Sequence, residues 1–247
     1  MARLWLGGVG LVALLACGSA YAASPISTWT GFYIGANAGY GFGNPSSFLT
    51  WNRLANNVAP LTPADYSTNV SGALGGLQFG YNYQINNFVI GAETDFQFSD
   101  ISGETKTGST FIPFLTDFAH FNEDQKLKWL GTVRARGGVL ATPSLLIFAT
   151  GGLAYGSVQA TSTFAFETPP FATYTGSTTQ TRVGWTAGGG VEWALDRAWS
   201  IKGEYLYYDL GTISVTGDEP GNAGFHTLLD QKVNGQIVRV GVNFKFN

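Results

Sequence analysis

Acidic and basic residues recur at alternate positions in several apolar stretches, and the chemistry open to them is ion pairing. Glu93 and Asp95 lie two residues apart, and so do Arg134 and Arg136. Side chains two apart on a strand share one face. The charges that this spacing assigns to one face are Glu93, Asp95, Arg134, Arg136, Glu192, Lys202, Glu204 and Arg239. Negative and positive charges on the same face predict a network of ion pairs.

Residue counting along neighbouring strands predicts partners within this set. Three pairs fall at similar heights: Glu93 with Arg136, Asp95 with Arg134, and Glu192 with Lys202. In a narrow enclosed interior an unpaired charge would be costly, so we expect a hydrogen-bonded plug. Two uses remain open for such a network. It could act as a selectivity filter or proton path, or it could fill an interior too narrow to conduct, which is the expected use if the strands close into a small barrel.

Enzymatic chemistry has little support in the sequence. The chain has two histidines, His120 and His226, and both are expected in outer loops. A lipid-modifying hydrolase would need a nucleophile held beside such a base. No G-x-S-x-G, H-E-x-x-H or phosphate-binding motif occurs at a strand end. We therefore predict no catalytic, cofactor-binding or metal-binding residues, although the loop pair Glu123 and Asp124 could bind divalent cations together with lipopolysaccharide.

Alternating apolar and polar residues predict strands, which must position the charges. The closing stretch, 236–247, holds Val238, Val240 and Val242 on one parity and Arg239 and Gly241 on the other. Similar alternation recurs at residues 29–42, 76–83, 88–98, 129–139, 185–193 and 199–207. The stretch 145–157 is mostly apolar on both parities, so its facing is open, and we favour Ile147, Leu153 and Tyr155 outward. After the first two dozen residues no stretch approaches the ~20 consecutive apolar residues of a spanning helix.

Connection lengths predict how these strands are arranged. Long and short connections alternate along the chain, as in small barrels whose short turns face the periplasm and whose long loops face outward. An open sheet edge cannot exist in lipid. The fold class is therefore all-β: an eight-stranded antiparallel up-and-down transmembrane β-barrel with four long extracellular loops and short periplasmic turns.

Outward-facing aromatic residues are predicted to form two girdles at the membrane surfaces. Aromatic side chains favour the headgroup level, and small aliphatic residues are expected between the girdles. The girdle residues are Tyr40, Phe42, Phe98, Trp129, Trp185 and Tyr207 toward the outside, and Tyr83, Trp193, Trp199, Phe244 and Phe246 toward the periplasm. Their sorting by height predicts a bilayer around the wall.

The first residues resemble an export signal. Arg3 precedes an apolar core, and Ala20-Tyr21-Ala22 forms a small-x-small cleavage site, so residues 1–22 are predicted as a signal peptide and 23–247 as the barrel domain. The single cysteine, Cys17, lies in this leader. An alternative is that Cys17 is a lipoprotein acceptor. The net charge of −3 argues against nucleic acid as a partner.

Several motifs resemble the porin-family small outer-membrane barrels of alpha-proteobacteria, the outer-membrane immunogenic proteins, which are OmpA-like. They are WTGFYIGANAGYG at 29–41, GTVRAR at 131–136, TGGLAYG at 150–156, EYLYYDLG at 204–211 and VRVGVNF at 238–244. The resemblance implies envelope support and surface antigenicity, with haemin binding or solute passage in some relatives. It supplies no catalytic residue. One departure is Asn247, which follows the aromatic residue that usually ends such chains.

These observations predict a non-enzymatic barrel of the cell outer membrane, with both mature termini in the periplasm. It would contribute to envelope integrity and present surface loops, and its lumen would be plugged by paired charges. The alternative is a narrow porin-like channel for small solutes. Expected partners are outer-membrane lipids and lipopolysaccharide, the barrel-assembly machinery through the C-terminal strand, and an unknown extracellular ligand. No cofactor is expected.

Overall fold

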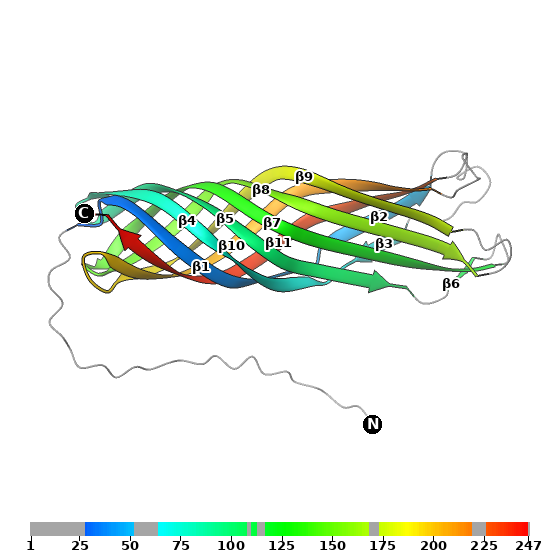
Figure 1. Cartoon of the computed structure of the whole chain (residues 1–247), viewed down its shortest axis with the longest axis horizontal. Coiled ribbons are helices and arrows are strands. Elements are labelled where there is room, and N and C mark those ends of the chain that lie inside the picture. The colour runs from blue at the N-terminus through cyan, green and yellow to red at the C-terminus, as the bar shows by residue number, and fades with distance from the viewer. Residues whose placement is uncertain are drawn as a thin grey trace, which may run out of the picture.

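An elongated, closed barrel of tilted strands makes up the protein (Figure 1). The computed structural model describes residues 28–51, 64–107, 110–112, 117–167, 173–218 and 226–246. The predicted leader, including Cys17, lies outside these residues. The two ends of the described chain lie at the same end of the barrel (Figure 1). That end also carries the short turns, so we call it the turn end and the opposite one the hairpin end.

Eight strands form the ring, and each pairs antiparallel with its neighbours. In ring order they are β1 (Gly31–Gly43), β4 (Val70–Ile85), β5 (Phe88–Lys106), β7 (Asp117–Thr142), β8 (Leu145–Phe166), β9 (Thr173–Ala194), β10 (Trp199–Asp218) and β11 (His226–Lys245). The pairing of β1 with β11, with Ala38 opposite Val240, closes the ring. Closure leaves no unpaired edge in this part of the sheet. The predicted fold class is confirmed.

Where the structure describes the four long excursions, they are mostly strand. Beyond Asn44 and Pro45 the path of β1 continues as β2 (Ser46–Trp51), which pairs with β11 and with β3 (Ala64–Ser67). The short β6 (Thr110–Ile112) pairs with the start of β7. Strand β7 has 26 residues, which at ~3.3 Å per residue is about 86 Å along the strand. A tilted strand crosses a membrane in about 10 residues. The barrel therefore extends well beyond a bilayer.

The two halves of the barrel have opposite polarity. In the turn half of β7, Val133 faces outward and Arg134 is buried inside. In the hairpin half of the same strand, Lys126 faces outward and Leu127 is buried inside. The turn half thus matches a lipid environment, and the hairpin half matches a water-soluble barrel with an apolar interior.

Irregularities in strand pairing occur at the boundary between these halves. The register shifts between Phe98 and Ile101 of β5, between Leu127 and Trp129 of β7, and between Asp209 and Thr212 of β10. In β10 the shift includes Gly211, whose φ is 78°. A bulge inserts a residue and can exchange the inward and outward positions along a strand. In β7 and β10 it does so, which keeps apolar residues inside the hairpin half.

Candidate functional site

Arg134 of β7 is the centre of the buried charges. One guanidinium nitrogen lies 2.5 Å from a Glu93 oxygen and 2.9 Å from an Asp95 oxygen, and the other lies 2.6 Å from Glu204. The Arg134 side chain is completely buried. Planar guanidinium groups bind several carboxylates with good geometry, so one residue links strands β5, β7 and β10 across the lumen.

Three further cations extend the network. Lys202 lies 2.8 Å from Glu93, and Arg239 lies 2.9 Å from Asp95 and 2.6 Å from Glu204. Arg136 lies 2.7 Å from Glu192 and 3.7 Å from Glu93. The eight predicted residues, four acidic and four basic, therefore form one connected cluster, here called the lumen network. Its formal charges cancel, which offsets the cost of burying them.

The network contains two of the three predicted pairs. Asp95 pairs with Arg134 and Glu93 pairs with Arg136, although the residue directly opposite Glu93 in the sheet is Arg134. Glu192 and Lys202 are level, as predicted, but the structure shows no ion pair between them. The Lys202 ammonium extends across the lumen to Glu93 instead. Partners across the lumen cannot be read from neighbouring strands, because the barrel's curvature decides which side chains meet.

Tyr33 adds an uncharged partner that the sequence analysis did not single out. Its hydroxyl donates to Glu93 at 2.7 Å and accepts from Arg136 at 3.0 Å. The Arg136 guanidinium also lies 4.2 Å from the centre of the Phe148 ring, a cation–π arrangement. The inward position of Tyr33 follows from its parity in β1, but its partners come from β5 and β7.

Apolar residues border the lumen network on both sides. Toward the turn end, Trp29, Val89, Leu146, Phe148 and Ala194 form a small buried cluster. The Trp29 indole N–H donates to the Pro143 carbonyl at 3.1 Å, which fixes the ring beneath the network. Toward the hairpin end lies a larger cluster, here called the upper core: it includes Leu49, Val70, Ile101, Phe121, Leu127, Val158, Leu206, Leu210, Ile213, Val215, Leu229 and Ile237. This layer was not predicted from the sequence.

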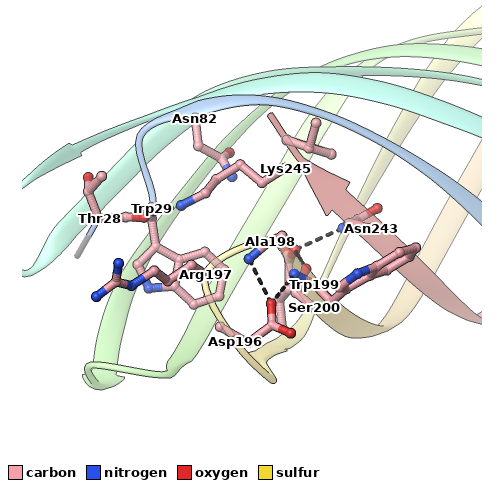
Figure 2. Close-up of a pocket in the computed structure, with 13 residues that line it drawn as sticks. Thr28, Trp29, Asn82, Asp196, Arg197, Ala198, Trp199, Ser200, Asn243 and Lys245 are labelled. Atoms are coloured by element: carbon pink, nitrogen blue, oxygen red, sulfur yellow. Dashed lines mark hydrogen bonds between the residues drawn. The ribbon is translucent and has the colours of Figure 1, made fainter. Parts of the chain in front are cut away.

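A pocket opens at the turn end beside the short turn from Leu195 to Ala198 (Figure 2). The Asp196 carboxylate accepts hydrogen bonds from the backbone N–H groups of Trp199 and Ala198, and these bonds lower the pKa of Asp196. Glu192, the other acid in the lining, accepts from Ser200 at 2.6 Å and from Asn243 at 2.8 Å. Both carboxylates thus have structural partners, and neither is paired with a histidine base.

All eleven predicted girdle residues face outward. Eight are exposed, namely Tyr40, Phe42, Tyr83, Phe98, Trp185, Trp193, Trp199 and Phe246. The other three are half-buried against neighbouring rings: Trp129 stacks on Phe96, Tyr207 packs on Trp185, and Phe244 packs on Trp199. Outward rings at both edges of an apolar band suit a bilayer. Their exact heights in the membrane stay a prediction.

The two histidines occupy strands, so their expected loop positions were wrong. His120 lies within β7, 3.6 Å from Glu167, and His226 begins β11 beside Asp218. Strand pairing continues further toward the hairpin end than the polar composition suggested. Within the described residues, no group of three or more His, Cys, Asp or Glu could hold a metal ion. Nor do these residues form a helix with the length and apolarity of a membrane span.

An antiparallel sheet closed into a ring, with an apolar outer band and buried charges inside, defines a transmembrane β-barrel of the outer membrane. The chain belongs to the family of the outer membrane protein beta-barrel domain, whose sequence profile matches residues 10–246. The predicted family resemblance and outer-membrane location are confirmed.

Named relatives and a solved structure agree with this assignment. The chain is 39% identical over 232 residues to the 31 kDa outer-membrane immunogenic protein of Brucella melitensis, covering 92% of this chain and 89% of that protein. It is 26% identical to a 22 kDa outer membrane protein of Rhizobium leguminosarum, covering 90% and 80% respectively. Outer membrane protein OprG of Pseudomonas aeruginosa matches with a TM-score of 0.51 at 16% identity, covering 88% and 97%. This last likeness concerns the fold alone.

Proposed function

We propose that the protein is a non-enzymatic outer-membrane barrel with a closed lumen. Its wall would support envelope integrity, and its hairpin half would lie at the cell surface, where it makes contacts and is recognised as an antigen. The observation that carries the proposal is the order of layers inside the barrel. A charge-balanced network fills the middle, and apolar side chains fill the lumen on both sides of it.

Closure is supported by the burial of the network. The side chains of Arg134 and Arg239 are fully buried, and those of Glu93, Glu192 and Lys202 are at most 3% exposed. A hydrated ion crossing the lumen would have to displace these ion pairs and then pass the upper core. Both steps are unfavourable because the first leaves buried charges unpaired and the second removes the ion from water.

Planar-bilayer recordings test closure against the alternative of a narrow porin-like channel. The purified full chain is expected to give no reproducible conductance steps. Arg134→Ala and Glu93→Ala remove parts of the network, while the apolar layers remain, so both variants should also stay closed. Reproducible steps in the wild-type protein, altered by either substitution, would show a channel and overturn the proposal.

Surface exposure of the hairpin half can be tested with single cysteines. Thr179 is exposed on β9 in the hairpin half, and Arg197 is exposed in a turn at the other end. In intact cells a membrane-impermeant maleimide is expected to label Thr179→Cys but not Arg197→Cys. Both should react after the cells are lysed. If only Arg197→Cys were labelled in intact cells, the barrel would have the opposite orientation in the membrane.

Three partners are proposed from the outer wall and its ends. Outer-membrane lipids would contact the apolar band, and lipopolysaccharide would meet Lys128, which is exposed next to Trp129. The barrel-assembly machinery would recognise β11, which carries Phe244 near its end and is followed by Phe246. An extracellular ligand would bind the hairpin end.

A deletion strain with unchanged resistance to detergents would exclude the role in envelope integrity. An unchanged assembly rate of the Phe246→Ala variant would exclude recognition of β11 through the Phe246 ring.

A further inference from the structure

Glu123 is an acidic side chain inside the apolar hairpin half of the barrel. Glu123 lies on β7 and is completely buried, as is Gln231 of β11. Its neighbour across the sheet is Ser162 of β8, and the neighbour of Gln231 is Ser47 of β2. Two pairs of polar sheet neighbours, Glu123 with Ser162 and Gln231 with Ser47, therefore face each other across the lumen within the upper core. The sequence predicted Glu123 in a loop, as one of a pair open to divalent cations, but the residue lies on a strand and faces the lumen.

Within the part of the chain that the structure describes, one of the two Glu123 carboxylate oxygens has hydrogen-bond donors and the other has none. Oε1 accepts from the Ser47 hydroxyl and from the Gln231 side-chain amide. Among the described residues, Oε2 of Glu123 has no hydrogen-bond partner, and neither do Oε1 of Gln231 and Oγ of Ser162. Since only the N–H₂ group of Gln231 can donate to a carboxylate, its oxygen must point elsewhere. Three buried oxygens thus lack partners among the described residues: two are on the hydrogen-bonded side chains of Glu123 and Gln231, and one is on Ser162, the sheet neighbour of Glu123.

No lysine or arginine pairs with Glu123 in the part of the chain that the structure describes. The lumen network lies in the other half of the barrel, where its own charges already balance. Tyr66 of β3 is a titratable side chain near Glu123: burial and the nearby carboxylate raise the pKa of the Tyr66 hydroxyl. A buried carboxylate without a cation is strongly unfavourable, and buried polar atoms without partners add to that cost.

We propose that the oxygens of Glu123, Gln231 and Ser162 bind a monovalent alkali cation, Na⁺ or K⁺. Carboxylate, amide and hydroxyl oxygens are hard ligands that suit such ions and do not suit soft metals. One carboxylate supplies one negative charge, so a monovalent ion neutralises the site, whereas a divalent ion would leave a buried positive charge. The ion would join β7, β8 and β11, and it would stabilise the hairpin half of the barrel.

Thermal unfolding at constant ionic strength tests the proposal. The full chain, folded in detergent micelles, is heated in chloride salts of Na⁺, K⁺ or the bulky cation N-methylglucamine. A ligand that binds only the folded state raises Tm, so Na⁺ or K⁺ should raise the wild-type Tm by about 2–4 °C over the bulky cation. Glu123→Gln should abolish this rise, because the variant removes the charge that attracts the ion while still accepting from Ser47.

Two further variants make the result specific. Ser162→Ala removes one proposed ligand without changing the charge, and it should reduce the rise in Tm. Glu104→Gln changes an exposed carboxylate of β5 that pairs with Lys106, and it should leave the rise unchanged. A wild-type Tm that is the same in all three salts would overturn the proposal. So would an equal rise in wild-type protein and in Ser162→Ala and Glu123→Gln, since the cations would then act elsewhere.

Discussion

Replacing Arg134 by alanine is expected to destabilise the barrel by about 3–5 kcal/mol, because removing one partner of a buried ion pair leaves the others uncompensated. Arg134 contacts three carboxylates, those of Glu93, Asp95 and Glu204, at 2.5–2.9 Å. Arg136, Lys202 and Arg239 remain, but the cluster would then carry four negative and three positive charges. Urea unfolding in lipid vesicles, followed by tryptophan fluorescence, measures the loss.

The matched control is an ion pair on the outer surface of the same strand. Lys126 lies 3.0 Å from Asp100, and both side chains are well exposed. Lys126→Ala should cost no more than about 1 kcal/mol, because water screens an exposed pair. The double variant Arg134→Ala, Glu204→Gln should recover part of the Arg134→Ala loss, since it removes one of the uncompensated charges. An Arg134→Ala cost as small as that of Lys126→Ala would contradict the ion-pair account of the network.

Replacing Val240 by arginine is expected to destabilise the protein in lipid by about 2–4 kcal/mol, because the new charge would lie near the bilayer midplane. Val240 faces outward in the middle of the apolar stretch of β11, and its residue is 63% exposed in the absence of lipid. Folding into vesicles, measured by urea titration, gives the change in the free energy of unfolding.

Leu228 provides the control because it is an aliphatic residue that also faces outward on β11, but in the hairpin half. Water surrounds that half if the polarity change marks the membrane boundary, so Leu228→Arg should change stability by no more than about 0.5 kcal/mol. Equal costs for the two substitutions would mean that the membrane does not end where the polarity of the barrel reverses.

In the turn half, the eight strands and the facing of their side chains could be predicted from the sequence. Alternation with period two is a local property, so it survives folding unchanged. It placed Glu93 and Arg134 inside and Trp185 and Trp199 outside, as the structure does. The sequence left the facing of the strand at 145–157 open. The structure has the favoured facing, with Ile147 and Leu153 outward.

The hairpin half was not predicted, since its strands alternate with the opposite polarity. Polar outward residues such as Thr175, Ser177 and Thr179 on β9 resemble a loop in composition. Their strand conformation depends on pairing with β8 and on burial of inward residues such as Tyr174 against the upper core. The register shifts at Leu127 and Asp209 also moved inward residues to the other parity, which simple counting cannot foresee.

By itself the sequence determined a membrane barrel with charges inside and aromatic rings outside, because strand periodicity and lipid solvation act on each strand separately. The tertiary structure decided which charges meet: Lys202 pairs with Glu93 from across the lumen, and Glu123 is enclosed by Ser47, Ser162 and Gln231. These contacts join residues far apart in the chain. They depend on ring closure and strand tilt, which no single stretch of sequence encodes.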